Sequence, residues 1–404
     1  MIQLSEEQQH VVNLALAGHN LFLYSKAGTG KSIVINTLTS YLEKGTYAIL
    51  GTSGVAAANI GGSTFHSFFA IKPFGVATNE TYNYVKKEKR KMWDKATTII
   101  IDEVSMLRPD VLDAANNTLL HNGCVPLTQK QIIFVGDLKQ LKPILSGKQE
   151  IKIFQESYSS LCFQEAFVYK ELNVQEVTMT KIFRQDDVEF KDQLDILRDN
   201  GSNFLTPYFR QFIRNEKNNG IVLAGYNDVV SEYNAKGLTE INEPLITYTG
   251  SVYGNFREKD YNVSQEVSVK HGCKIMYLHN HPVYPLVNGT LGTFLLINNT
   301  PFIEVNGTKY FLEKIELEYK EYQLQVNEID GTEKVKLVTL SSIIQYPIRV
   351  AYALSINKSQ GLSLSPITLD IRKALFAEGQ LYVALSRLKV PEDTEIADVL
   401  CILK

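Results

Sequence analysis

The feature that most constrains this chain is a short glycine-containing loop that joins an apolar strand to a helical stretch. Residues 21–24 (LFLY) predict a buried strand, residues 25–30 (SKAGTG) a tight loop, and Lys31-Ser32 open a helical run over residues 33–42. Strand, loop and helix in this order are the context that a Walker A phosphate-binding loop requires. The alternative is a glycine-containing turn with an exposed lysine, which leaves the flanking elements unexplained.

The residue types in this loop suit ATP bound together with Mg²⁺. Glycines allow backbone N–H groups to turn toward phosphate oxygens, and the N-terminus of the following helix favours their negative charge. Lys31 is expected to contact the β- and γ-phosphates, and the Ser32 hydroxyl to hold Mg²⁺. Ser25 stands where the first glycine of the motif is usual. We assign the nucleotide contacts to Ala27, Gly28, Thr29, Gly30, Lys31 and Ser32.

Polar residues follow two further apolar runs. Residues 97–101 (TTIII) predict a buried strand that ends in Asp102-Glu103. Asp102 is predicted to hold Mg²⁺ through its water shell, and Glu103 to accept a proton from the attacking water. Residues 132–135 predict the next strand, after which Gln140 can contact the γ-phosphate and the water. The alternatives are an acidic turn at a strand end and a solvated loop amide.

The first half of the chain alternates β-type runs with helical stretches. The runs are residues 20–24, 48–51, 98–101 and 131–135. This alternation predicts an α/β fold with a parallel sheet and crossover helices. It is interrupted at residues 72–95, an insertion that contains the basic run 86–91.

The second half has a different organisation. A second mixed region begins near residue 178, with a helix over residues 188–198 and strands at 367–370 and 399–403. In residues 252–340, glycines separate β-branched runs such as 293–297 and 334–340. This pattern predicts a small all-β insertion.

Composition limits how the chain could hold a partner. Lys plus Arg (41) against Asp plus Glu (44) gives a net charge of -3, so a nucleic acid would need a local groove. Stacking and a local basic track can grip a single strand without bulk positive charge.

The four cysteines form no C-x-x-C pair, which favours a reducing compartment. With no leader-like start and no apolar run of about 18 residues, we expect a soluble intracellular protein without membrane contact.

Seven motifs in order resemble those of the superfamily-one helicases, most closely the petite integration frequency (PIF) family, with its RecD-like and phage Dda-like relatives. They are TSGVAA at 52–57 with IGGSTFHSF at 60–68, IDEVSM at 101–106, GD and QL within 136–141, IFRQ at 182–185, LVNGTLG at 286–292, SINKSQG at 355–361 and QLYVALSR at 380–387.

The resemblance implies two RecA-like P-loop domains with ATP between them. The first domain is expected at residues 1–68 and 92–177, with a small wedge insertion at 69–91. The second is expected at residues 178–251 and 341–404, with an SH3-like β insertion at 252–340.

The resemblance also assigns site residues. It gives Gln8 to adenine recognition, Gly361 to the nucleotide, and Arg184 and Arg387 to the γ-phosphate as fingers from the second domain. DNA contacts are expected at Thr52, Phe65, His66, Asn288, Lys358 and Ser359. The alternatives are a solvated helix residue for Gln8, surface salt bridges for the arginines, core packing for Phe65 and His66, and a solvated helix face for the basic run. We interpret His279 and His281 as part of a solvated loop, because other metal ligands are missing nearby.

The activity that the resemblance implies is ATP-dependent 5′-to-3′ movement along single-stranded DNA, with unwinding of 5′-tailed or forked duplexes. G-quadruplex DNA is a further candidate substrate, and the family acts in DNA repair, recombination and telomere maintenance. We expect a cytoplasmic monomer of bacterial or phage origin. Asn357 replaces a usual histidine and Lys142 a usual proline, which bears on coupling between DNA and ATP, and residues 116–131 keep the PIF signature only loosely.

Two other functions remain open at this point. One is an ATPase stimulated by single-stranded DNA that remodels nucleoprotein without unwinding. The other is a P-loop ATPase that ignores nucleic acid, for which the motifs around Arg184, Arg387 and residues 355–361 would have no reason to occur.

Overall fold

The computed structural model describes the chain except for residues 1–3, 54–55, 58–59, 72–74, 79–80, 146, 202, 213–219, 259–260, 262, 327–332, 361, 363, 365, 389–393 and 398–404. The chain divides into two compact units. The first consists of Met1–Arg184 and Lys320–Leu340, and the second of Gln185–Tyr319 and Ser341–Lys404.

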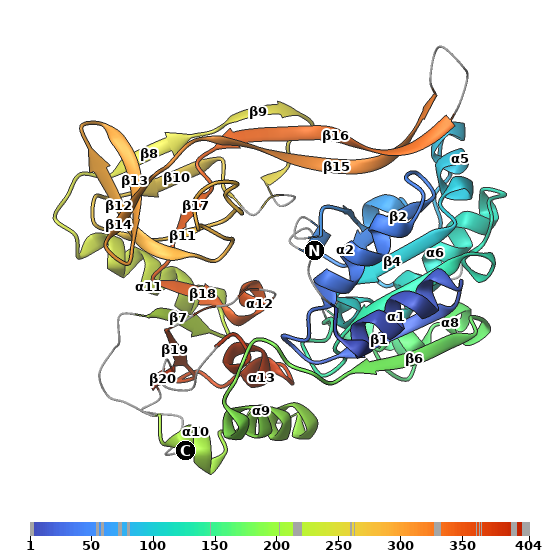
Figure 1. Cartoon of the computed structure of the whole chain (residues 1–404), viewed down its shortest axis with the longest axis horizontal. Coiled ribbons are helices and arrows are strands. Elements are labelled where there is room, and N and C mark those ends of the chain that lie inside the picture. The colour runs from blue at the N-terminus through green and yellow to red at the C-terminus, as the bar shows by residue number, and fades with distance from the viewer. Residues whose placement is uncertain are drawn as a thin grey trace. The chain divides into compact units, whose positions relative to one another are not determined.

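The first unit is built on a six-stranded sheet in which every pairing is parallel (Figure 1). In sheet order the strands are β3 (Ser63–Thr64), β2 (Tyr47–Gly51), β4 (Thr98–Asp102), β5 (Gln131–Gly136), β1 (Asn20–Ser25) and β6 (Val174–Met179). The parallel α/β prediction for the first half is confirmed, as are its four predicted strands.

Helices cover both faces of this sheet, because successive strand side chains point to opposite sides. Leu21 and Leu23 share one core with α1 (Glu6–Leu16) and α2 (Lys31–Tyr41). Phe22 faces the other core, which contains residues of α4 (Phe65–Phe68), α5 (Lys87–Lys95), α6 (Pro109–His121) and α8 (Phe167–Glu171). The remaining helices of this unit are α7 (Lys148–Gln155) and the 3₁₀ turns η1 (Val104–Met106), η2 (Leu127–Gln129) and η3 (Phe163–Glu165).

Part of the predicted all-β region belongs to the first unit. The described residues of segment 320–340 belong to β15 (Ile315–Val326) and β16 (Glu333–Gln345). Tyr322 is buried in the core beside Phe68, and its hydroxyl accepts a hydrogen bond from the Ile49 N–H at 3.1 Å. These contacts explain why this segment groups with the first unit.

The first unit also extends to Arg184, beyond the predicted boundary at residue 177. The Glu7 carboxylate accepts hydrogen bonds from the Thr180 N–H and hydroxyl and from the Lys181 N–H, at 3.0, 2.6 and 3.2 Å. The Phe183 N–H donates to the Gly28 carbonyl at 2.8 Å. Segment 180–184 is therefore fastened to α1 and to the glycine loop.

The second unit combines a parallel sheet with antiparallel β structure. The parallel sheet contains β18 (Ala353–Ser355), β7 (Ile221–Ala224), β19 (Ile367–Asp370) and β20 (Thr394–Ala397), in that order. Its helices are α9 (Val188–Asn200), α10 (Pro207–Arg210), α11 (Asn227–Thr239), α12 (Ile356–Ser359) and α13 (Gln380–Leu385). The predicted helix at 188–198 and strand at 367–370 are confirmed, and the predicted strand at 399–403 lies outside the described residues.

The antiparallel part has its own core around Ile275, Phe294 and Ile303. Two strand pairs lie outside the larger sheet: β10 (Glu266–Val269) pairs with β8 (Ile246–Thr249), and β16 pairs with β9 (Ser251–Gly254). The larger sheet has five strands, which are, in order, β14 (Thr308–Phe311), β13 (Thr300–Val305), β12 (Leu291–Ile297), β11 (Lys274–Tyr277) and β17 (Ile348–Val350). The all-β insertion is confirmed as β structure, and its assignment to the SH3-like class, like that of a wedge at 69–91, stays a prediction.

Candidate nucleotide-binding and DNA-binding sites

Three loops of the first unit meet at the carboxyl edge of its sheet. Strands β4, β5 and β1 are neighbours, with Ile101 opposite Phe134 and Tyr24 opposite Gly136. The glycine loop, Asp102 and the loop that carries Gln140 therefore leave the sheet side by side. Ligands of open parallel sheets bind at this edge.

The glycine loop has the conformation that a phosphate site requires. Gly28 and Gly30 adopt left-handed backbone angles, with φ of 82° and 85°. Helix α2 begins at Lys31 and has no side-chain hydrogen bond at its N-cap, so its first N–H groups face the loop uncapped. The Lys31 ammonium donates to the Lys26 carbonyl at 3.1 Å, and Ser32 is exposed. Ser25 ends β1 in register with Met179, and such an extended position does not need glycine.

Asp102 is a buried carboxyl group at the end of β4. It is 7% exposed, and its Oδ1 has no hydrogen-bond partner among the described residues. Burial, and then the charge of Glu103, raise the pKa of Asp102 to about 7. An oxygen left without a donor inside a protein is unfavourable unless it binds a cation. Asp102 with the exposed Ser32 hydroxyl thus fits the hard oxygen ligands that Mg²⁺ prefers.

Glu103 has a strained backbone. Its φ of 52° and ψ of 43° lie in the left-handed region, which costs a non-glycine residue about 1–3 kcal/mol. The Thr52 hydroxyl donates to the Glu103 carbonyl at 3.0 Å and helps to hold this turn. Strain of this kind clusters at functional sites, and no sequence pattern announces it.

Gln140 is 3% exposed in the loop after β5. Its N–H donates to the Asp137 carbonyl at 3.0 Å, while the Lys139 N–H donates to the Asp137 carboxylate at 3.1 Å. This loop is therefore ordered and buried, and the solvated-amide alternative does not describe it. The role of Gln140 as a γ-phosphate sensor stays a prediction.

Gln8 braces the glycine loop from α1. It is 3% exposed, its Nε2 donates to the Thr29 carbonyl at 3.1 Å, and its Oε1 accepts from the Ser5 N–H at 3.0 Å in a capping box. A Cβ placed on Gly30 would lie 2.6 Å from Gln8 Nε2, so only glycine fits there. Gln8 is not a solvated helix residue, and its contact with adenine stays a prediction.

The two predicted arginine fingers occupy different surroundings. Arg184 packs on the glycine loop so closely that a Cβ on Gly28 would lie 2.7 Å from the Arg184 Cβ. Arg387 is 2% exposed, and its guanidinium donates to the Val383 carbonyl and the Ser386 hydroxyl, each at 2.8 Å. Arg387 is thus no surface salt bridge. Their role as fingers stays a prediction, and Gly361 lies outside the described residues.

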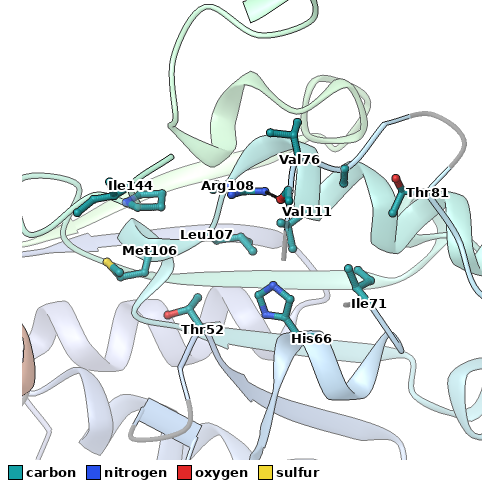
Figure 2. Close-up of a pocket in the computed structure, with 13 residues that line it drawn as sticks. Thr52, His66, Ile71, Val76, Thr81, Met106, Leu107, Arg108, Val111 and Ile144 are labelled. Atoms are coloured by element: carbon teal, nitrogen blue, oxygen red, sulfur yellow. Dashed lines mark hydrogen bonds between the residues drawn. The ribbon is translucent and has the colours of Figure 1, made fainter. Parts of the chain in front are cut away.

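Thr52 and His66 line a pocket of about 270 Å³ in the first unit. Figure 2 shows the His66 imidazole projecting into this pocket between Thr52 and Ile71. Phe65 does not reach it. The Phe65 side chain is fully buried and packs on Phe69 with ring centroids 4.8 Å apart, so core packing replaces the predicted DNA contact.

The predicted DNA contacts of the second unit lie on two segments. Asn288 is in the loop between β11 and β12, where its N–H donates to the Asn280 side chain at 2.9 Å. On α12, Lys358 is exposed, and burial of its stem and the charge of Arg349 lower its pKa. Ser359 is buried with its hydroxyl donating to the Ile356 carbonyl at 2.7 Å, so this side chain is not presented to a ligand.

The side chains of the basic run 86–91 differ in their surroundings. Lys86, Lys87 and Arg90 are exposed, whereas the Lys89 ammonium donates to the Ser67 carbonyl at 2.8 Å. Lys89 is therefore structural.

His281 accepts hydrogen bonds from two backbone N–H groups of its own turn, and no group of three or more His, Cys, Asp or Glu side chains in the described chain could hold a metal ion. Within that same part of the chain, no helix is long and apolar enough to span a bilayer.

Sequence reasoning missed one buried ion pair that holds the 69–91 insertion. Asp110, 1% exposed at the start of α6, accepts from Arg108 Nε and Nη2 at 2.9 and 2.7 Å and from the Ala77 N–H at 2.8 Å. Arg108 Nη2 also donates to the Gly75 carbonyl at 2.6 Å. An aspartate in a first helical turn suits the helix dipole without any such partner, so the sequence offers no signal for this contact.

Comparison with known proteins places these features in a family. A model described as PIF1-like helicase matches residues 3–205. The chain is 30% identical to the ATP-dependent DNA helicase Pif1 of Campylobacter jejuni, over 94% of this chain and 89% of that protein. It is 29% identical to the protein of the same name from Bdellovibrio bacteriovorus, over 96% and 86%.

Solved structures agree with these matches. The fold is similar to that of Bacteroides sp. Pif1 in complex with ADP-AlF4, with a TM-score of 0.86, 29% identity, and coverage of 98% of this chain and 93% of that chain. It is also similar to Bacteroides Pif1 bound to single-stranded DNA, with a TM-score of 0.68, 30% identity, and coverage of 98% and 92%.

Proposed function

Because this chain belongs to the PIF1-like helicase family, we propose that it is an ATP-dependent DNA helicase. It hydrolyses ATP, moves 5′ to 3′ along single-stranded DNA and separates 5′-tailed or forked duplexes. The relatives named as ATP-dependent DNA helicases match this chain over nearly its whole length. Bacteroides Pif1 has been solved bound to single-stranded DNA, and a further similar structure concerns DNA unwinding at forked duplexes by two coordinating Pif1 helicases.

The observation that carries the proposal is the chemistry gathered at one sheet edge. The uncapped N-terminus of α2, the Lys31 ammonium and the Asp102 oxygen that has no described donor lie at one edge of the sheet, after strands β1 and β4, which are separated by β5. Phosphate oxygens would accept from the N–H groups of the glycine loop and from Lys31. Ser32 and Asp102 would hold Mg²⁺, which supplies charge neutralisation on the β- and γ-phosphates.

Glu103 is the proposed general base. Its turn projects from the strand end next to Asp102, where a carboxylate can accept a proton from a water molecule in line with the γ-phosphate. Burial keeps bulk water away from Asp102, and Glu103 follows it directly in a left-handed turn. Arg184 and Arg387 are the proposed groups that offset charge in the transition state.

The test is ATP hydrolysis with and without a short single strand, followed by unwinding of duplexes with either a 5′ or a 3′ tail. We expect stimulation by the single strand and unwinding of the 5′-tailed duplex. Stimulation without unwinding would leave a translocase that remodels nucleoprotein. Absence of stimulation would refute the DNA-dependent function.

Two variants separate chemistry from DNA binding. Lys31→Ala should abolish hydrolysis and leave nucleotide-free binding of single strands intact, because the Lys31 ammonium donates to the Ser25 and Lys26 carbonyls at the glycine loop. Glu103→Gln should retain ATP binding and lose turnover. Sedimentation on and off DNA tests the proposed monomer, and a G-quadruplex placed ahead of the duplex tests that substrate. Retained turnover in Lys31→Ala would contradict the assignment of the site.

A further inference from the structure

The chain leaves the first unit and enters the second at the peptide bond between Arg184 and Gln185. Before this bond, the Phe183 N–H donates to the Gly28 carbonyl, so the segment is held on the glycine loop. After it, Gln185 is 1% exposed and comes two residues before Asp187, the N-cap of α9. Glutamine is mostly an exposed residue, and a buried amide needs hydrogen-bond partners.

The Gln185 amide is bound to the end of α13. Its Nε2 donates to the Leu388 carbonyl at 2.8 Å and to the Ser386 carbonyl at 3.3 Å. Helix α13 ends at Leu385, and carbonyl groups at and beyond a helix end receive no hydrogen bond from the helix itself. The two N–H groups of one amide therefore serve two of these carbonyls. Helix α9, which begins just after Gln185, packs against α13 in the same unit (Figure 1).

The two carbonyls stand on either side of Arg387. Arg387 is 2% exposed, and its own carbonyl accepts a hydrogen bond from the Leu364 N–H at 3.1 Å. The backbone that carries this arginine is thus held from both sides by one side chain. A guanidinium lies at the end of a long side chain, so its position depends on where the backbone is fixed. A misplacement of about 1 Å can lower a catalysed rate about a hundredfold.

From these contacts we propose that Gln185 is a positioning residue for Arg387 in ATP hydrolysis. Its amide fixes the backbone from which the Arg387 guanidinium projects, and its peptide bond joins this anchor to Arg184. The placement of both arginines therefore depends on one short segment of the chain. The inference rests on the proposed function, because it takes Arg387 as a group that offsets charge on the γ-phosphate in the transition state.

The first experiment removes the amide and keeps the size of the side chain. Gln185→Met should lower kcat for ATP hydrolysis on a short single strand about tenfold. The KM for ATP and the affinity for the strand should stay within twofold, because Arg387 acts in the transition state. An unchanged kcat in folded Gln185→Met would overturn the proposal.

Thr206→Val is the matched control for stability. It removes a hydroxyl of the second unit that donates to the Gln193 side chain at 2.8 Å. This variant should lower the free energy of unfolding in urea and leave kcat unchanged. An equal loss of kcat in Thr206→Val would show that destabilisation of the unit alone accounts for the effect, which contradicts positioning.

The second experiment asks whether Gln185 acts through Arg387. Arg387→Met keeps an unbranched side chain in this buried position and should lower kcat about a thousandfold, which single turnovers with excess protein can follow. Adding Gln185→Met should then cost less than a further twofold, because no guanidinium remains to be positioned. A further tenfold loss in the double variant would refute the proposal.

Gln185→Asn carries the test if Gln185→Met does not fold. Asparagine keeps the amide but is one methylene shorter, so it does not span the contact with the Leu388 carbonyl. The same tenfold loss of kcat is expected, and full kcat in this variant would contradict the role of the contact.

These outcomes separate the inference from the function beneath it. If the unaltered protein is active and Arg387→Met loses turnover while Gln185→Met keeps it, the helicase proposal stands and the positioning role does not. If Arg387→Met keeps full turnover, the role of Arg387 fails and the inference fails with it. If the unaltered protein hydrolyses no ATP with single strands, the helicase proposal itself fails.

Discussion

Replacing Asp110 by asparagine should loosen the 69–91 insertion without unfolding the first unit. The Asp110 carboxylate accepts hydrogen bonds from the Arg108 guanidinium and from the Ala77 N–H, and Arg108 in turn donates to the Gly75 carbonyl. One residue therefore anchors both backbone groups of the insertion at Gly75 and Ala77. None of its partners belongs to the sheet that carries the nucleotide site.

The magnitude follows from burial. The Arg108 and Asp110 side chains are 15% and 0% exposed, and removing one partner of a buried pair costs about 3–5 kcal/mol. Asparagine keeps one oxygen that can still accept from the Ala77 N–H. We therefore expect a free-energy cost near the lower end of this range. A loss of about 3 kcal/mol corresponds to roughly a hundredfold increase in local opening.

Hydrogen exchange measures this opening directly. In Asp110→Asn, the Ala77 amide should exchange roughly a hundredfold faster, while amides of β4 keep their protection and ATP hydrolysis stimulated by single strands stays within twofold. If the 69–91 insertion is the predicted wedge, unwinding should fall as well, because Asp110 no longer fixes the position of the insertion. The exposed Asp192→Asn on α9 is the control for charge.

A second variant tests the cause. Most of the cost in Asp110→Asn comes from the unpaired Arg108 charge, so adding Arg108→Gln should restore part of the lost protection at Ala77. Unchanged exchange at Ala77, or an equal loss of protection in β4, would refute the reasoning.

Three further contacts give predictions of their own. Tyr322→Phe should lower the free energy of unfolding in urea by about 1–3 kcal/mol, because the Ile49 N–H loses its buried acceptor. Burial lowers the pKa of Lys130 to about 8, so between about pH 8 and 10 the unfolded chain binds more protons than the folded chain. Stability should therefore rise with pH in that window by about 3 kcal/mol relative to a Lys130→Met variant, and parallel pH profiles would contradict this. Glu7→Gln should speed exchange at the Thr180 amide about fivefold, in line with about 1 kcal/mol for a weakened hydrogen bond.

Strands and helices that are apolar over their whole length could be predicted from the sequence. Strands β1, β2, β4 and β5 are buried on both faces, and their runs of Ile, Leu and Val exclude other placements. Strand β6 was missed, because its sequence VQEVTM is largely exposed, and its place at the sheet edge comes from pairing with β1 and from the packing of Val177 and Met179. Strand β7 was missed as well, although its four buried residues (IVLA) form a run as short as that of β19, which was predicted.

In the candidate site too, features that depend on one segment could be predicted, and contacts between separate elements could not. The positions of Lys31, Ser32 and Asp102 after buried strands could be predicted, because each depends on spacing within one segment, while their roles stay predictions. The inward turn of Lys89, the burial of Phe65 and the Asp110 anchor could not, since their partners lie on other elements. The sequence of a basic run does not indicate which of its lysines will donate a hydrogen bond to a backbone carbonyl of another element.

The sheet edge holds three arrangements that are unfavourable in isolation. Asp102 has a buried oxygen without a donor among the described residues, Glu103 has a left-handed backbone, and the Lys31 ammonium donates to the Ser25 and Lys26 carbonyls. Each is relieved or used when a nucleotide and a cation bind, because these supply a charge for Asp102 and phosphate oxygens for Lys31. A surface selected for stability alone would have removed all three, since one substitution suffices for each. Their coincidence at one sheet edge, after β4 and β1 with β5 between them, is therefore a physical signature of ligand chemistry, and it stands independently of the motifs that first indicated the site.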